Sequence, residues 1–286
     1  MILTTTGSIA DSDAGGTLSA NSLKLDSGTG VGTSGNLIDT AVMTLAAQAS
    51  TSGGVFVTET DGLTIGTVDS LSGLTTTNGA VTLVSTNGDI TVDQDIVAGD
   101  ASDDEEFDVI IQAEGTATGT SQIDLNATVQ ADDDADIRAA VNIRQASATD
   151  FIISDTLRLE AGGDIATSTS VGGAAAIDVR VNTLSAHAGT AAANVNNLNV
   201  NQDSGAAGTL TIGNASDLIG GGSGAGVTIG NGSTRGDVIV TTEAHTLSIA
   251  DAVSSDDSAD SDVILQAGGA ASDIAIGANV TATTDM

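Results

Sequence analysis

Acidic side chains are gathered in three short runs of this chain of 286 residues. The runs read GDASDDEEFD at 99–108, ADDDAD at 131–136 and SSDDSADSD at 254–262. Proteins bind Ca²⁺ with about six to eight oxygen atoms, mainly from carboxylates and carbonyls, so the runs are candidate calcium sites. The ligands that we predict are Asp103, Asp104, Glu105, Glu106, Asp132, Asp133, Asp134 and Asp136. The alternative is a solvated surface whose repulsion keeps chains from aggregating.

Other residue types that carry chemistry are scarce. The two histidines, His187 and His245, lie in no metal-spaced cluster and are predicted to be ordinary surface or turn residues, and the chain has no cysteine. Enzymes that cleave acidic polysaccharides need basic side chains and aromatic rings, but this chain has 6 Lys and Arg, 3 Phe and no Trp or Tyr. No Ser/His/Asp order, phosphate loop or paired acid and base stands out. We therefore predict that the chain is not an enzyme.

The charge balance limits the partners. The formal net charge is −32, from 6 Lys and Arg against 38 Asp and Glu. Binding of nucleic acid needs clustered Lys and Arg, so it is excluded, and anionic membrane surfaces are disfavoured. No run approaches the ~20 apolar residues of a membrane helix, so membrane insertion is not expected. Hydrophobic residues make up 40% of the chain, which is enough to bury a core.

The elements that must position the acidic runs belong to a repeat. Segments 81–100, 109–132, 157–176 and 263–285 share an alternating aliphatic pair, a small or Gly-containing turn, and an aliphatic that starts a second alternating strand. A further aliphatic follows six residues later in every copy: Ile90 to Ile96, Ile123 to Val129, Ile165 to Val171 and Ile274 to Val280. Weaker echoes start at Leu25, Ile65, Ile212 and Leu247.

Alternation with period two predicts strands, and Gly, Asn, Asp, Ser and Thr between them predict turns. The chain has no proline, which suits a chain paired in β ladders almost everywhere. A repeat of about 20 to 26 residues cannot bury its own apolar face, whereas stacked repeats can. We therefore predict an all-β solenoid over 1–286, with Ile90, Ile123, Ile165 and Ile274 pointing inward. The rival architecture is a string of antiparallel β-sandwich domains.

Each acidic run follows the second strand of a copy or echo and therefore falls in the link between two coils. We expect these links to project from a corner, outside the core, and to lie above one another. Like charges ~5 Å apart repel by about 1 kcal/mol even in water. Solvent and salt can absorb that repulsion, or a cation can bridge the carboxylates.

The segments LRLEAGGDIATSTSV at 157–171 and VTLVSTNGDITVDQDI at 81–96 resemble the repeats of filamentous-haemagglutinin-type adhesins and other giant bacterial surface exoproteins. The resemblance is clear over about 81–176 and 237–286 and loose over 1–80 and 177–236. It implies a right-handed parallel β-helix, export across the envelope, and a role in adhesion or surface coating. The chain lacks the family's secretion domain with Asn-Pro motifs and a cell-anchoring segment, which fits an internal shaft fragment of a longer repeat chain.

The function expected from these observations is a structural shaft or spacer segment of an extracellular bacterial adhesin or surface fibre. The alternative is a self-assembling extracellular filament or surface-layer subunit, and a β-helical polysaccharide-active enzyme is the least favoured. The sequence starts on MILTTTG and finishes on the alternating stretch NVTATTD, without an amphipathic capping helix. Uncapped solenoid ends expose strand edges, so the expected partners are copies of the chain stacked end to end or further repeats, besides a host or cell-surface ligand. The expected location is the cell surface.

Overall fold

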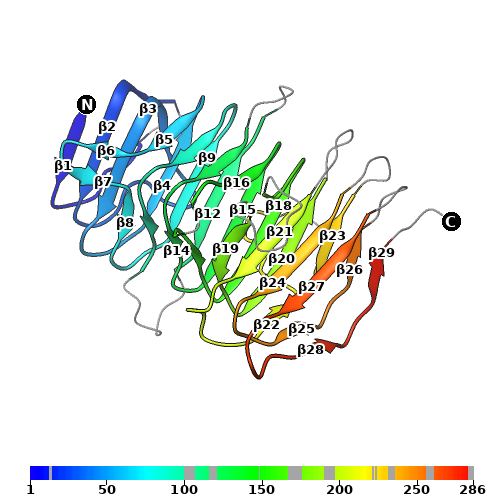
Figure 1. Ribbon diagram of the computed structural model, residues 1–286. Coiled ribbons are helices and arrows are strands. Elements are labelled where there is room, and N and C mark those ends of the chain that lie inside the picture. The colour runs from blue at the N-terminus through cyan, green and yellow to red at the C-terminus, as the bar shows by residue number, and fades with distance from the viewer. Residues whose placement is uncertain are drawn as a thin grey trace.

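The computed structural model describes residues 1–12, 15–99, 107–115, 121–147, 149–166, 176–189, 197–220, 222, 224–230, 236–255 and 261–282. In these residues the chain forms strands and no helix, and the strands wind into a parallel β-solenoid of about nine turns. Twenty-seven strands join in one sheet that continues from one end of the molecule to the other (Figure 1). The prediction of an all-β parallel solenoid is confirmed, and the rival antiparallel sandwiches are wrong.

The N-terminal coils contain long strands that are later divided. β2 pairs along its length with β3, and β3 then pairs in turn with three shorter strands, β4, β5 and β8. Between β5 and β8 a small antiparallel hairpin, β6 with β7, leaves the solenoid. The strands of this part are β1 (Ile2–Thr5), β2 (Thr17–Ser27), β3 (Ile38–Ala49), β4 (Val55–Glu59), β5 (Leu63–Ile65), β6 (Thr67–Val68), β7 (Leu71–Ser72) and β8 (Leu74–Thr76).

From 81 to 153, each coil has three short strands on three parallel ladders. The first ladder holds β9 (Val81–Ser85), β12 (Val109–Ala113) and β15 (Asp134–Ala139). The second holds β10 (Ile90–Val92), β13 (Ile123–Leu125) and β16 (Ile143–Gln145), and the third holds β11 (Ile96–Val97), β14 (Val129–Gln130) and β17 (Ile152–Ile153).

After β17 the ladders are reassigned. The first ladder continues through β18 to β20 and then divides, because the two halves of β20 pair with different strands, β22 and β23. The second and third ladders meet in β21. Leu198 of β21 pairs with Ile165, and Val200 of β21 pairs with Ile177 of β19. The strands of this part are β18 (Thr156–Ala161), β19 (Ile177–Arg180), β20 (Thr183–Ala188), β21 (Leu198–Gln202), β22 (Leu210–Ile212), β23 (Val227–Ile229), β24 (Val238–Thr242), β25 (Leu247–Ile249), β26 (Val253–Ser255), β27 (Val263–Ala267), β28 (Ile274–Ile276) and β29 (Val280–Ala282).

The core is one continuous column of Val, Leu, Ile and Ala that runs the length of the solenoid. Alternate residues of each strand point into it, which is why the burial of β9 and β12 alternates residue by residue. Stacked aliphatics of similar shape fill this space without aromatic rings. Each fully buried Val, Leu or Ile side chain contributes about 1.5–3 kcal/mol by leaving water.

The six-residue spacing found in the sequence marks two different pairs of ladders. Ile90 stacks on Ile123 and Ile96 on Val129, as predicted. Ile274 and Val280 instead stack on Leu247 and Val253, which belong to the divided first ladder.

Ile90, Ile123 and Ile165 are fully buried, but the prediction is wrong for Ile274, which is 41% exposed because its coil is the last that the structure describes. Val171 lies outside the described residues.

Polar side chains at one corner of the solenoid join each coil to the next. The residue immediately before the second-ladder strand accepts a backbone N–H from the same position one coil later, as in a helix cap. These hydrogen bonds run from Gln122 N to Asp89 (3.0 Å), Asp164 N to Asn142 (2.7 Å), Asn197 N to Asp164 (2.7 Å), Asp237 N to Asn197 (3.4 Å) and Asp262 N to Asp237 (3.0 Å). We call these residues the staple column. Two of the three Asp-Ile pairs of the repeat, at 89–90 and 164–165, contribute their Asp to it.

Candidate functional site

The structure separates the predicted calcium ligands into different environments. Asp103, Asp104, Glu105 and Glu106 lie outside the described residues. Of the second run, Asp132 and Asp133 are partly exposed, whereas Asp134 and Asp136 are buried. The expectation that this run projects from a corner as a link is therefore wrong from Asp134 onward, where the chain is already in strand β15.

Three carboxylates do converge at the corner where the first-ladder strands begin. Asp108, Asp133 and Asp134 each place an oxygen within 4.8 Å of the others. Asp108 and Asp134 precede the paired residues Val109 and Ala135, so the predicted stacking of acidic residues from successive coils is found here. The sequence prediction included two of the three residues and missed Asp108, although it belongs to the first run.

The hydrogen bonds of this cluster resemble those of the staple column. Asp108 accepts the backbone N–H of Asp134 at 3.4 Å, and Asp134 accepts the hydroxyl of Thr156 from the coil that follows. Three hard oxygen donors fit part of a Ca²⁺ coordination shell, which needs about six to eight. The cluster therefore offers two compatible roles, joining coils directly and contributing to a cation site.

Asp136 has a different role, because it lies in a buried ionic network on the outward face of β15. Its carboxylate is 3.2 Å from Arg138 and accepts the backbone N–H groups of Leu218 (3.0 Å) and Ile219 (3.3 Å). Burial raises the pKa of Asp136, against the lowering effect of Arg138. With its oxygens engaged by the protein, Asp136 does not fit the predicted calcium site.

The partners of Asp136 belong to a segment that folds back over the solenoid. We call the described residues of this segment, 214–220, 222, 224 and 225 between β22 and β23, the strap. Asp217 of the strap forms an ion pair with Arg138 and also accepts the N–H groups of Gly220 (2.7 Å) and Gly222 (3.0 Å). Arg138 in turn donates to the carbonyl of Gly220 at 3.0 Å. These contacts join residues about 80 positions apart in the chain.

The strap also covers a buried serine and histidine on β20. Ser185 Oγ lies 3.1 Å from His187 Nε2, and His187 Nδ1 lies 2.6 Å from the hydroxyl of Thr228. His187 Nε2 also bonds the carbonyl of Gly224, which can only accept, so Nε2 carries the proton. A protonated Nε2 cannot take a proton from Ser185, so the pair is not arranged as nucleophile and base.

The two histidines differ from each other in their burial. Burial lowers the pKa of His187, which is 3% exposed, so the prediction of a surface or turn position is wrong for it. His245 lies in a bend after β24, as predicted. The signal that was missed is the alternation of β20, which places Ser185 and His187 on one outward face.

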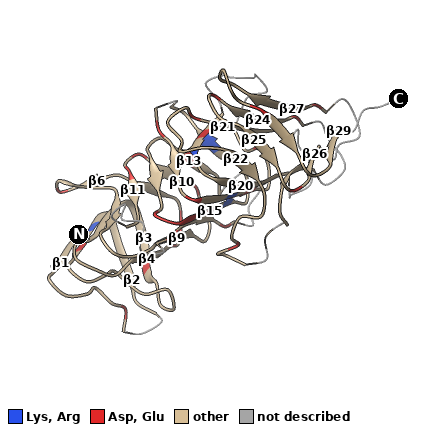
Figure 2. Cartoon of the chain, turned by 90° about the horizontal axis from the view of Figure 1, so that it is seen from below, with Lys and Arg blue, Asp and Glu red and all other residues tan. Residues whose placement is uncertain are grey.

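Three of the described basic side chains form ion pairs with segments that leave the regular strands of the solenoid. Lys24 lies 3.7 Å from Asp69 of the β6–β7 hairpin, Arg138 pairs with Asp217 of the strap, and Arg180 lies 2.6 Å from Asp203 after β21. Figure 2 shows how sparse the basic positions are beside the acidic ones along the described chain. The chain has 6 Lys and Arg, so these three contacts use half of its basic residues.

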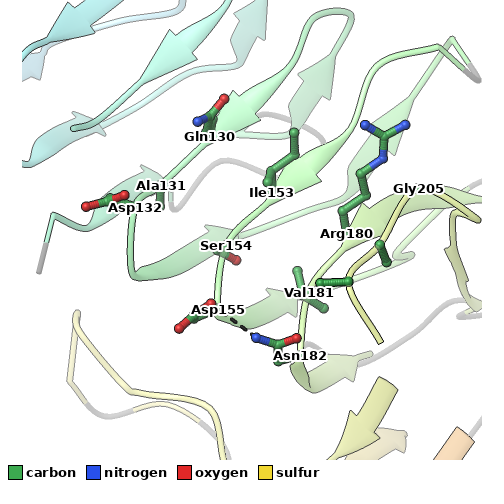
Figure 3. Close-up of a pocket in the computed structure, with 12 residues that line it drawn as sticks. Gln130, Ala131, Asp132, Ile153, Ser154, Asp155, Arg180, Val181, Asn182 and Gly205 are labelled. Atoms are coloured by element: carbon green, nitrogen blue, oxygen red, sulfur yellow. Dashed lines mark hydrogen bonds between the residues drawn. The ribbon is translucent and has the colours of Figure 1, made fainter. Parts of the chain in front are cut away.

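A cavity of about 440 Å³ lies beside the segment that follows β21. Its lining includes Asp132, Asp155, Arg180 and Asn182, and Asn182 donates to Asp155 at 3.1 Å, the dashed line in Figure 3. Arg180 is already paired with Asp203 and lies 3.8 Å from the ring centre of Phe151. The lining combines polar side chains with Ala131, Ile153, Val181, Ala206 and Ala207, and the charge of its guanidinium is compensated by Asp203.

The fold places the chain in the class of β-solenoid repeat proteins. Comparison of the chain with protein-family models, with curated proteins and with solved structures gave no match. Within the described residues there is no helix long and apolar enough to span a bilayer.

Proposed function

We propose that this chain is a structural shaft or spacer segment of an extracellular bacterial adhesin or surface fibre. The observation that carries the proposal is the sheet that runs from β1 to β29 with a continuous aliphatic core inside it. Parallel strands in successive coils lie ~4.8 Å apart, so each coil adds a fixed increment of length. A fixed rise per repeat is what a spacer requires.

The surface supports the same role. A net charge of −32 keeps a long particle soluble and resists side-by-side association through repulsion. Several outward polar groups of the described strands, such as Asp136 and Arg138, bind segments that fold back over the solenoid. Within the described residues we identify no convergence of acid, base and nucleophile in the manner of a catalytic site. The resemblance of 81–176 and 237–286 to the repeats of giant surface exoproteins adds the extracellular setting to the proposal.

The spacer role is tested by removing one coil. Residues 109–134 carry the chain from the start of β12 to the residue before Ala135, which pairs with Val109. Deletion of 109–134 should leave a folded rod shorter by ~4.8 Å, measured by small-angle X-ray scattering together with far-UV circular dichroism. A matched deletion of half that length breaks the register and should unfold the neighbouring coils. Equal damage from both deletions would contradict a modular spacer.

The extracellular setting has its own test. Antibodies raised against the folded chain should label intact cells of the native source, with a cytoplasmic protein as the unlabelled control. Labelling only after the cells are permeabilised would overturn the surface location.

A further inference from the structure

The strap is held against the solenoid by side-chain contacts and not by strand pairing. In the part of the chain that the structure describes, it pairs with no strand. Its base is fixed, because the N–H of Gly226 donates to the carbonyl of Gly213 at 3.0 Å. β22 and β23 therefore keep their places in the ladder wherever the strap lies. Opening of the strap is thus a local change that does not require the core to unfold.

His187 on β20 is the titratable group that lies beneath the closed strap. The residue is 3% exposed, its Nε2 donates to the carbonyl of Gly224 in the strap, and its Nδ1 accepts the hydroxyl of Thr228 on β23. A neutral imidazole meets both contacts, because one nitrogen is a donor and the other an acceptor. A proton added to Nδ1 removes that acceptor and places a full charge in a site that water hardly reaches.

Two charged side chains of β18 face His187 from the coil before it. Glu160, its register partner, favours a positive charge on the imidazole, but lies 3.2 Å from Arg158 and 3.9 Å from Arg138. Arg158 is 2% exposed and opposes a second positive charge beside it. A Cβ at Gly222 of the strap would collide with both guanidinium groups, so the strap lies directly on them. The charges beneath the strap are therefore closely packed as well as buried.

The charged groups of the strap and of β15 pair with each other. Asp217 of the strap forms an ion pair with Arg138, and so does Asp136 of β15. Slight burial acts to raise the pKa of Asp217, but hydrogen bonds within the strap and the charge of Arg138 lower it overall. Burial raises the pKa of Asp136, so the folded state favours its protonated form, which is the opposite preference to that for His187. Protonation of Asp136 therefore opposes opening of the strap in acid.

The pH dependence that His187 gives to the strap has a definite sign. Burial lowers the pKa of His187 below its ordinary value of 6.5, and Arg158 acts in the same direction, against the strap carbonyl and the charge of Glu160. The closed strap therefore favours the neutral imidazole. The stability that comes from this preference is complete above about pH 6.5 and is lost as the pH falls from there through the pKa of the closed state.

We propose that the strap is an acid-released cover, held over β20 while His187 is neutral and released when His187 takes up a proton. Release gives the imidazolium access to water and separates Asp217 from Arg138. It uncovers the outward faces of β15, β18 and β20, which present Arg138, Arg158 and the charged imidazole. The latch operates whatever the role of the solenoid, so its failure leaves the shaft role intact.

Opening can be measured with a single introduced thiol, because the chain has no cysteine. Ala215 of the strap is 2% exposed, whereas the adjacent Ser216 is exposed. Ala215→Cys should react with a pyridyl disulfide, a reagent that also works in acid, only while the strap is open. Ser216→Cys should react whether the strap is open or closed and gives the intrinsic rate at each pH. The ratio of the two rates measures the open fraction.

The rate ratio should be small at about pH 7 and should rise by up to about tenfold for each pH unit below about 6.5. His187→Gln, made in both thiol chains, should abolish the rise, because its amide can donate to Gly224 and accept from Thr228 without titrating. His245→Gln is the matched control, since His245 lies in a bend after β24, and this variant should keep the rise. Far-UV circular dichroism over the same pH range checks that the rod stays folded.

Three results would overturn the acid-released cover. The first is a rate ratio that does not change between about pH 7 and pH 5. The second is a rise that persists in His187→Gln, which would assign it to a carboxyl group. The third is a rise that coincides with loss of the circular dichroism signal, which would mean that the whole solenoid unfolds.

A second measurement covers the case in which His187→Gln leaves the strap open at every pH. The imidazole C–H resonances of the chain without an introduced thiol are assigned by comparison with the two histidine variants. The His187 resonance should titrate over the pH range in which the rate ratio rises. Titration of His187 outside that range would overturn the proposal.

Discussion

Two segments leave the solenoid through the same kind of opening, the β6–β7 hairpin at 67–72 and the strap between β22 and β23. At the base of the hairpin the N–H of Gly73 donates to the carbonyl of Gly66 at 3.0 Å, and at the base of the strap Gly226 donates to Gly213 at 3.0 Å. The preceding strands, LTI at 63–65 and at 210–212, are identical in sequence. In the preceding coil a single residue lies opposite each opening. It is Ala46 on β3 for the hairpin and Ser185 on β20 for the strap.

The second glycine of each pair explains why the opening is so similar. Gly73 has a φ of 74° and Gly226 a φ of 94°, values that L side chains rarely adopt. A Cβ at Gly73 would also collide with the carbonyl oxygen of Asp95, and a Cβ at Gly226 with that of Ala252, each in the next coil. The core ladder therefore stays in register on both sides of the opening, whatever leaves through it.

What differs between the two segments is how each is fastened. The hairpin is held by Lys24 and Asp69, a pair whose carboxylate is exposed. The strap is held over the buried groups Asp136, Arg158 and His187. An exposed ion pair is worth about 0–1 kcal/mol, whereas breaking a buried one costs about 3–5 kcal/mol. The comparison teaches that the same opening serves a weakly held and a strongly held segment.

The largest predicted effect is the loss of stability when the buried ion pair beneath the strap is removed. Asp136→Ala should lower the free energy of unfolding by about 3–5 kcal/mol, because it removes a buried partner of Arg138 and the acceptor for two strap N–H groups. Asp69→Ala in the hairpin should cost about 0–1 kcal/mol. Equilibrium unfolding in urea measures both. Equal losses would show that buried charge does not distinguish the strap from the hairpin.

The second largest effect is expected at the two glycines that close the openings of the hairpin and the strap. Gly73→Ala and Gly226→Ala should each cost about 1–3 kcal/mol, because both force a side chain into a positive-φ conformation against a backbone carbonyl. Gly224→Ala, within the strap, is the control, since nothing lies within 4 Å of its added Cβ. The readout is again urea unfolding. A cost at Gly226 without one at Gly73 would contradict a common opening.

A third kind of fastening, through an ion, is predicted at Asp108, Asp133 and Asp134. At a Ca²⁺ concentration ten times the dissociation constant, one site adds about 1.4 kcal/mol of stability. The melting temperature should therefore be higher in millimolar Ca²⁺ than in sodium chloride of matched ionic strength, and Asp133→Asn should remove the difference. Equal melting temperatures for the wild type would leave this cluster as charge that is solvated or bonded within the protein.

The smallest effect concerns the staple column, which fastens coil to coil. Asp164→Ala should cost about 1 kcal/mol, like the loss of a helix cap, whereas Asp164→Asn keeps the acceptor. Burial raises the pKa of Asp164 above its ordinary value of 3.8, against the hydrogen bond from Asn197. The protonated form is therefore favoured by folding, and that stability is lost as the pH rises from about 3.8 through the folded pKa.

Asp164→Asn also provides a control for the pH dependence of the stability. Asp164→Asn cannot titrate, so its stability relative to the wild type should increase between acidic and neutral pH. Urea unfolding at a series of pH values measures the change. A constant difference between the two proteins would contradict the raised pKa.

The architecture could be predicted because its determinants are local. Alternation and the six-residue spacing each lie within one repeat, and they led to the stacking of Ile90 on Ile123. The repeat pattern does not predict the coil from β15 to β17, because the outward positions of β15 carry Asp134, Asp136 and Arg138 and the segment resembles an acidic link. The charges of that strand are compensated by the strap, about 80 residues away, and no local pattern reveals such a partner.

The residues of the candidate site could likewise be predicted only where the repeat itself determines their position. The acidic runs predicted Asp133 and Asp134 in a stacked cluster, since stacking follows from the repeat itself. Asp217 gave no signal of its role, and the alternation of β20 places His187 on the outward face without predicting its burial, because both roles depend on the strap lying over β15 and β20. Burial of charge depends on contacts between distant segments, whereas ladder formation depends on neighbours in the repeat.

The paired glycines have a consequence for how such a protein can change over generations. Because the two glycines meet in one hydrogen bond, the ends of the inserted segment are fixed and its length is free. Doubling the length of a flexible loop costs only about 0.6 kcal/mol in closure entropy. Insertions and deletions between the glycines can therefore accumulate without shifting the register of the core ladders, so that the length of the inserted segment and the register of the rod evolve as separate traits.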